Sequence, residues 1–233
     1  MTPLRILDFV LALVIVPGIQ EPTADDILAR LEKSLDGIED YTVELQASVD
    51  MDRLQVPSMT ATMYFKAPDK IHFESSSFAM LPREGLALNP SDLRRKFRGE
   101  RLGMDTVDGL SCVVVRLHPL SEESRRPGTT LWVDPVRWVV TQMHSQPFEG
   151  RRLLAHFSYR RVEDRFWLPE TLIVTLETLD TAPEPRVSIP GEAPGVQRQR
   201  APLRKGTMTV VYSHYQVNTG LTDDRFDERK ERP

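Results

Sequence analysis

Residues 41–52 read YTVELQASVDMD, and apolar or aromatic side chains alternate with polar ones along the whole segment. Side chains on a β-strand point alternately to its two faces, so this segment predicts a strand with one apolar face and one hydrophilic face. The apolar face must be covered by other parts of the molecule. What covers it decides the fold, because similar patterns recur along much of the chain.

Eight further segments have strand-like patterns, separated by short links in which proline is frequent. The link at residues 67–69, Ala-Pro-Asp, is turn-like, so the strands on either side of it are expected to pair as a hairpin. Nine or so strands with short links predict a mainly antiparallel meander. The eight segments are 58–66, 70–75, 109–119, 129–135, 137–145, 152–162, 171–179 and 206–218.

Two segments predict helices. In residues 23–38, TADDILARLEKSLDGI, Thr23 can cap the N-terminus with Asp26 as the acidic partner of a capping box, and Gly37 is a natural stop. A second, short helix is expected within residues 89–100, capped by Ser91. The first helix carries an apolar stripe that needs a surface to lie on, formed by Ile27, Leu28, Leu31, Leu35 and Ile38.

The two ends of the chain and one internal segment differ from this pattern. Residues 1–20 combine Arg5 with an apolar run and predict a secretory signal peptide; a buried N-terminal helix or an uncleaved anchor is the alternative. Residues 21–226 are expected to form a single domain, followed by a charged tail at 227–233. Residues 181–206 are proline-rich and predict a loop, either simply solvated or, because its second half is basic, a docking arm for an anionic partner.

Composition and motifs point away from several function classes. The net charge of −4 gives no reason to expect a nucleic-acid partner. The single cysteine, Cys112, lies in an apolar run and is expected to be a buried, inert thiol. No nucleophile motif, phosphate loop or metal-binding spacing is present, so the sequence predicts a protein that is not an enzyme and has no metal or cofactor. The histidines are scattered, and His72, His156 and His214 are expected at the surface.

An acidic group near the C-terminus, Asp223, Asp224 and Asp227, lacks the spacing of a calcium loop. Thr222 and the first two aspartates are instead expected to cap a short closing helix.

The strands and the first helix allow two arrangements. The sheet can close over the helix as a solid core, or it can form an incomplete barrel whose hollow the helix only partly fills. Methionines on the apolar faces, such as Met51, Met59 and Met63, suit a hollow that accepts flexible chains, but methionine is also common core filler. The pattern alone leaves both arrangements open.

An ordered set of segments resembles the LolA/LolB-like family of outer-membrane lipoprotein-sorting proteins. The segments are ILARLEKSLDGIEDYTVEL, MYFKAPDKIHFE, TLWVDPVRWVVTQMH, FSYRRVEDRFWLPETLIV and VVYSHYQVNTGLTDDRF, which together extend over nearly all of residues 23–226. The resemblance implies an α+β fold in which a curved antiparallel sheet forms a half-open β-barrel, with helices closing its mouth. It also implies a periplasmic carrier of lipid or lipoprotein acyl chains, and no chemistry.

On this interpretation the protein is an exported monomer that acts with a membrane donor and acceptor protein. An envelope sensor or regulatory module of the same fold, which binds a protein partner, is the alternative, and a structural envelope protein with a solid core is a third. The opening helix is the candidate lid, through Leu28, Leu31 and Leu35. The residues predicted to line the hollow are Val43, Leu45, Met59, Met63, Phe65, Ile71, Phe73, Leu131, Val133, Phe157, Leu172 and Val174.

Overall fold

A single antiparallel sheet of ten strands dominates the computed structural model, which describes residues 21–51, 54–75, 88–121, 128–148, 151–178 and 205–227. Its strands are β1 (Asp40–Met51), β2 (Leu54–Lys66), β3 (Lys70–Glu74), β4 (Phe97–Val107), β5 (Leu110–Pro119), β6 (Thr129–Asp134), β7 (Val139–Phe148), β8 (Arg151–Val162), β9 (Phe166–Thr178) and β10 (Lys205–Val217).

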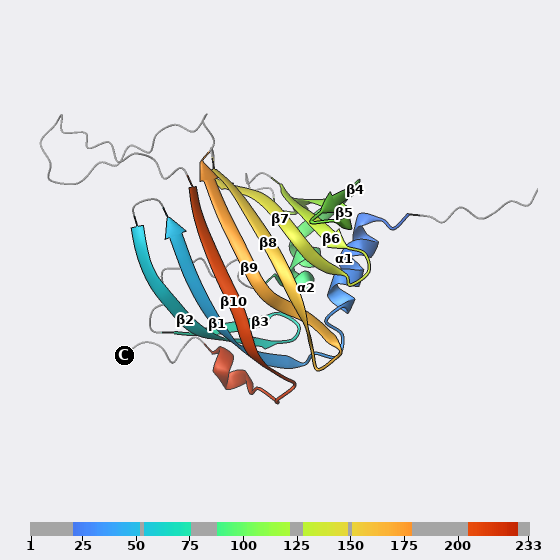
Figure 1. Cartoon of the computed structure of the whole chain (residues 1–233). Coiled ribbons are helices and arrows are strands. Elements are labelled where there is room, and N and C mark those ends of the chain that lie inside the picture. The colour runs from blue at the N-terminus through green and yellow to red at the C-terminus, as the bar shows by residue number, and fades with distance from the viewer. Residues whose placement is uncertain are drawn as a thin grey trace, which may run out of the picture.

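The strands follow the order β3-β2-β1-β10-β9-β8-β7-β6-β5-β4 in the sheet. The last strand therefore returns to pair with the first, with Leu45 opposite Tyr212 and Ala47 opposite Val210. The sheet is strongly curved but does not close, because β3 and β4 remain as its two edges (Figure 1). This is the α+β architecture and the half-open barrel that the resemblance implied.

The alternation in β1 is reproduced in its burial. Val43, Leu45 and Ala47 are buried, whereas Glu44 and Gln46 between them are exposed. The predicted hairpin of β2 and β3 is also present, with Met63 opposite Phe73. The apolar side chains thus face the inside of the curve, where they form one continuous core.

Helix α1 (Ala24–Lys33) begins as predicted. Thr23 and Asp26 form a capping box, in which the Thr23 hydroxyl accepts from the Asp26 amide and the Asp26 carboxylate accepts from the Thr23 amide. The helix ends at Lys33, earlier than predicted, and Ser34 caps it; Gly37 instead lies in the turn that follows, with φ +90°.

Helix α2 (Pro90–Lys96) lies within the predicted segment, but its cap differs from the prediction. Its cap is Asn89, whose side-chain oxygen accepts from the Ser91 amide, so Ser91 is the second helical residue and not the cap. Pro90 suits the first helical position because it has no amide hydrogen to leave unpaired. The helix stops at Lys96 and the chain continues directly as β4, a strand that the sequence pattern did not predict.

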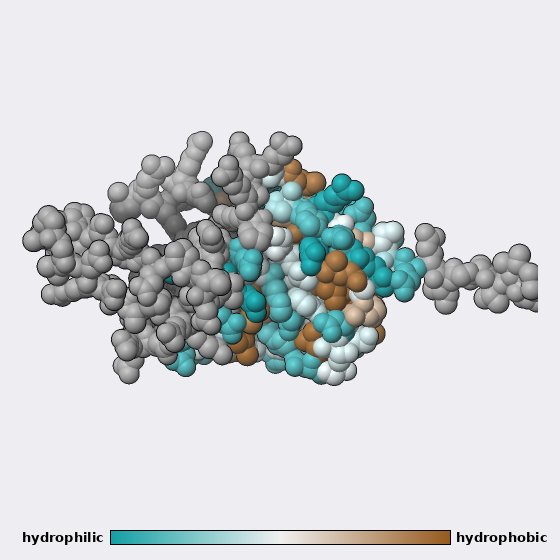
Figure 2. Space-filling model, turned by 90° about the horizontal axis from the view of Figure 1, so that it is seen from above, coloured by the Kyte–Doolittle hydropathy of each residue, from teal (hydrophilic) through white to brown (hydrophobic). Residues whose placement is uncertain are grey.

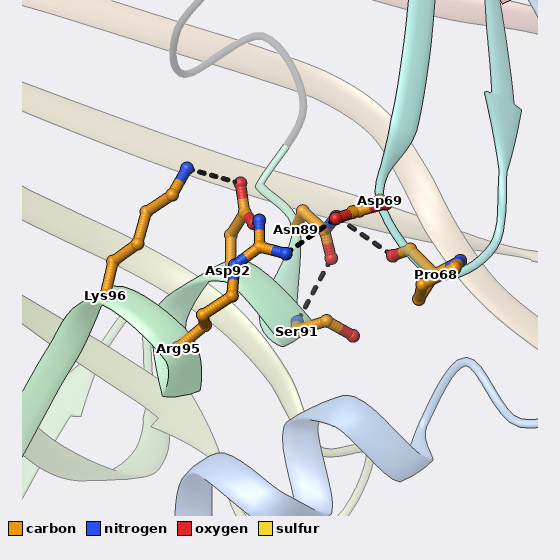
Figure 3. A network of polar contacts seen from close by, with 7 residues as sticks. All are labelled: Pro68, Asp69, Asn89, Ser91, Asp92, Arg95 and Lys96. Carbon is orange, nitrogen blue, oxygen red and sulfur yellow. Dashed lines mark hydrogen bonds and ion pairs between the residues drawn. The ribbon is translucent and has the colours of Figure 1, made fainter.

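Helix α2 connects the two edges of the sheet. The Asn89 side-chain amide donates to the Pro68 carbonyl in the β2–β3 turn, and Arg95 forms an ion pair with Asp69 in the same turn at 2.7 Å (Figure 3). Arg95 and Lys96 also contact Asp92. Strands β3 and β4 are the two edges of the sheet and do not pair with each other. Helix α2 therefore links the β2–β3 turn to the start of β4 through its side chains.

The C-terminal part of the described chain corrects a third prediction. A short 3-10 helix, η2 (Asp223–Phe226), is present, but Thr222 makes no side-chain cap bond. Asp223 instead pairs with Lys66 and Lys70 at 2.7 and 3.1 Å, and Arg225 lies over the Tyr64 ring at 4.4 Å. These contacts fasten η2 to the β2–β3 hairpin.

Several predictions lie partly or wholly outside the described residues. The signal peptide at 1–20 is outside them, as are residues 181–204 of the proline-rich segment and 228–233 of the charged tail. Lys205 and Gly206, at the end of the proline-rich segment, belong to β10.

Candidate functional site

The inside of the curved sheet is the candidate site. The structure brings all of the predicted lining residues into one apolar cluster, although they come from β1, β2, β3, β6, β8 and β9. Most of them are buried, and only Ile71 and Val174 are partly exposed. The fully or nearly buried members are Val43, Leu45, Met59, Met63, Phe65, Phe73, Leu131, Val133, Phe157 and Leu172.

Helix α1 lies over this inner face. Of the predicted lid residues, Leu28 and Leu31 are 2% exposed and Leu35 is partly buried against the same cluster. Ile27, which sequence reasoning placed on the stripe but not among the lid residues, is fully buried. Burial of each such side chain is worth about 1.5–3 kcal/mol, so these residues account for most of the helix's attachment.

The helix approaches β4 very closely at Gly99. A Cβ on Gly99 would lie 2.8 Å from the Ala24 Cβ and 3.4 Å from Leu28 Cδ1. Real Cβ atoms do not come this near to other carbons, so a glycine is needed for α1 to reach this depth. Gly99 has the opposite strand's Val115 beside it, which confirms that α1 covers the inward face of β4.

Contacts near the C-terminal end of α1 hold its orientation. Arg30 lies over the Trp138 ring at 4.7 Å, and Glu32 pairs with Arg94 of α2. Beyond the helix, the Asn218 side chain donates to the Gly37 carbonyl at 2.8 Å. Side chains thus attach the helix to neighbouring elements, and within the described part of the chain no backbone hydrogen bond joins α1 to a strand.

An aromatic layer, of which only Phe65 was among the predicted lining residues, lies at the end of the sheet where β1 begins. Tyr41 stacks on Phe65 at 4.9 Å and meets Tyr215 edge-on at 5.7 Å. The hydroxyls of Tyr159 and Tyr215 donate to the carbonyls of Val140 and Pro169. Burial raises the pKa of these tyrosines well above the usual value, so they stay neutral and present ring surface to the apolar cluster.

A buried carboxylate fixes the rim at this end. Asp40, 2% exposed, accepts hydrogen bonds from the amides of Thr219, Gly220 and Leu221, at 2.8 to 3.0 Å. Burial alone would raise the pKa of Asp40, but the backbone donors outweigh it and hold the pKa below its usual value. The start of β1 is thereby tied to the segment that follows β10.

The unpredicted strand β4 brings two more residues to the inner face. Arg101 pairs with the inward-facing Val115, and after a bulge at Gly103, Met104 pairs with the inward-facing Val113. Arg101 forms an ion pair with Glu21 at 2.6 Å. Met104 is 51% exposed, so the inner face is accessible to solvent at this point. Only recognition of β4 as a strand would have placed these residues.

On the outer face of β1, Glu44, Gln46 and Ser48 are exposed. Seen from above, the described part of the surface is mainly hydrophilic or intermediate, with a few apolar patches (Figure 2). His72 and His156 are half-buried and His214 is exposed, consistent with the surface positions predicted for them.

Cys112 is fully buried, as predicted, with its Sγ 3.4 Å from the Thr141 hydroxyl. Among the described residues, no three His, Cys, Asp or Glu side chains come together as a metal site would require.

No family model and no curated protein matches the sequence. Several solved structures do match. One is a DUF1329 family protein from Desulfovibrio piger, with a TM-score of 0.58 at 15% identity; the match covers 87% of this chain and 95% of that protein's chain. An outer membrane lipoprotein-sorting protein domain from Vibrio parahaemolyticus has a TM-score of 0.56 at 14% identity, with the same coverage. A LolA superfamily protein from Nitrosomonas europaea has a TM-score of 0.59 at 11% identity, over 89% of this chain and 99% of its own. The fold of this chain is LolA-like.

Proposed function

We propose that this protein is an exported carrier that binds the acyl chains of lipids or lipoproteins between α1 and the inner face of the sheet. One observation carries the proposal: a short helix, held by side-chain contacts among the described residues, covers the apolar inner face of a sheet that does not close. Such a cover can be displaced without breaking the sheet, which would expose a continuous apolar surface to a ligand.

The binding energy would come from hydrophobic transfer. Each methylene group moved from water to an apolar surface contributes about 0.8 kcal/mol, so one long acyl chain can supply most of the affinity. The chain would replace part of the contact between Leu28, Leu31 and the sheet. Release would follow from any partner that favours the state in which α1 is seated, because Leu28 and Leu31 then occupy the apolar inner face.

The similar structures support a role in transport or sorting to the outer membrane, since one of them is a lipoprotein-sorting protein domain. A periplasmic location, with residues 1–20 as the export signal, fits this role. Within the described residues, no helix is both long and apolar enough to span a bilayer. A membrane donor and a membrane acceptor protein are the partners that such a cycle requires.

The test compares an inward and an outward substitution in the full chain. Met63→Arg places a charge among buried inner-face side chains, whereas Ile173→Arg places the same charge on the outer face, where Ile173 is 40% exposed. Native mass spectrometry of protein purified from a bacterial envelope, followed by solvent extraction, should find acylated lipid on the wild type and on Ile173→Arg. Met63→Arg should carry none.

Met63→Arg can also fail to fold, so circular dichroism accompanies the measurement and Leu31→Asp on α1 serves as a second inward charge. A wild-type protein that is folded, carries no lipid and takes up none on challenge contradicts the proposal. Co-purification of a protein partner without lipid would favour the sensor alternative.

A further inference from the structure

We infer that Arg101 anchors the anionic head group of the amphiphile whose acyl chain occupies the interior. The inference rests on the proposed function and narrows its ligand class to acyl chains that end in a carboxylate or a phosphate. It starts from an arginine on the inward face of β4, where the two preceding inward positions, Phe97 and Gly99, contact the core and α1. Arginine is costly to place there unless its charge has a partner.

The position of Arg101 is set by its pairing. It lies opposite Val115, which is fully buried in the inner cluster, and two residues beyond Gly99, which touches α1. The side chain is 21% exposed, so part of it reaches solvent, whereas its Nε is buried. Arg101 thus stands at the boundary between the interior and water.

The partner that Arg101 has in this structure is weak. Glu21 is 72% exposed, and an ion pair with so exposed a partner contributes little because water and salt screen it. Among the described residues, the Nε of Arg101 is buried and has no hydrogen-bond partner. A planar guanidinium binds carboxylate or phosphate through two parallel hydrogen bonds, which a ligand oxygen reaching Nε would complete.

Met104, close to Arg101 on β4, marks a path for the acyl chain of the ligand. Met104 is the next inward-facing residue on β4 and is half exposed, and its partner Val113 belongs to the buried cluster. A ligand whose head group replaces the Glu21 carboxylate at Arg101 can therefore pass its chain over Met104 towards Val113. Glu21 would act as an internal stand-in for the head group in the unliganded protein.

The experiment uses the delipidated full chain and displacement of a neutral fluorescent apolar probe. Three ligands share a sixteen-carbon chain: hexadecanoate, hexadecyl phosphate and uncharged monohexadecanoylglycerol. Arg101→Gln should weaken binding of one or both anionic ligands by about tenfold or more and leave the uncharged ligand unchanged. If binding weakens for hexadecanoate alone, the head group is a carboxylate; if it weakens for hexadecyl phosphate alone, the head group is a phosphate.

Two further variants sharpen the result. Arg98→Gln, on the same strand but exposed and opposite the exposed His118, is the matched control and should change nothing. Glu21→Gln removes the competing carboxylate from an exposed position and should strengthen anion binding roughly two- to fivefold, even if Arg101→Gln does not fold.

Equal weakening of charged and uncharged ligands by Arg101→Gln, or no weakening at all, overturns the inference and leaves the carrier function in place. Failure of the wild type to bind any of the three ligands overturns the carrier function and the inference together.

Discussion

Asp40 shows at the scale of one residue how the ends of the domain are joined. Its carboxylate is buried and receives three backbone amides and the Thr219 hydroxyl, all from the segment after β10. A buried charge is tolerated when donors replace water in this way. The bonds connect the start of β1 to residues that lie 179 to 181 positions later in the sequence.

Asp40→Asn should lower the free energy of unfolding at pH 7 by about 1–3 kcal/mol, because an amide accepts these bonds less strongly and brings its own donors into the site. The folded-state pKa of Asp40 is below the unfolded value of about 3.9, so its stabilisation is present above that value. It is lost as the pH falls through the folded pKa.

Urea unfolding of both proteins from pH 7 to pH 3 checks this prediction. The difference between wild type and variant should be constant down to about pH 5 and shrink at lower pH. A difference that does not change with pH would mean that the carboxylate charge is not what stabilises the rim.

The same scale explains what the sequence could and could not predict about caps. Thr23 and Asp26 have capping-box spacing and form one, because both partners lie on the same turn. Ser91 was predicted to cap the second helix, but Asn89 caps it and also reaches the Pro68 carbonyl, a contact made only in the folded chain. Asp223 likewise meets two lysines that are distant in sequence.

At the scale of elements, β1 and β4 show the limits of pattern reading. The regular alternation of β1 specifies a strand and its inner face from sequence alone. In β4, FRGERLGMDTV, two glycines and four charged residues conceal the strand. It exists because its neighbour β5, with Val113, Val114 and Val115, provides a strong pairing partner. The pattern therefore predicted most residues of the inner face, but not Arg101 and Met104.

Gly99 determines how deeply α1 is seated on β4. Gly99→Ala should force α1 away from the sheet and lower the free energy of unfolding by about 1–3 kcal/mol, because its methyl group would meet the Ala24 methyl. Hydrogen exchange should quicken in α1 first, while β1 and β10 change little.

The double variant Ala24→Gly with Gly99→Ala removes the clash and is the matched control. It should restore slow hydrogen exchange in α1. The glycine at position 24 still lowers the stability of the helix, by at most about 1 kcal/mol. If the double variant exchanges as fast as Gly99→Ala alone, the contact between these two residues does not set the position of α1.

At the scale of the whole molecule, the curved sheet, its two unpaired edges and the helix that covers it form one arrangement. The sheet turns its apolar residues inward, α2 bridges the β3 side to β4, and α1 covers the inner face beside that bridge (Figure 1). The alternation within the strands predicted which side chains face inward. It did not predict that the sheet stays open, since closure depends on whether the first and last strands of the sheet, β3 and β4, pair with each other. The open sheet under a displaceable helix is the basis of the carrier proposal.

The most direct test of this proposal maps where an acyl chain binds. The full chain is illuminated with a sixteen-carbon fatty acid that carries a photoreactive group at its methyl end, and the modified residues are identified by tandem mass spectrometry. The proposal predicts adducts on inward-facing residues such as Met63, Phe157 and Leu131, in competition with unlabelled lipid. Adducts confined to exposed apolar residues such as Val136 and Val211, or insensitive to competing lipid, would contradict it.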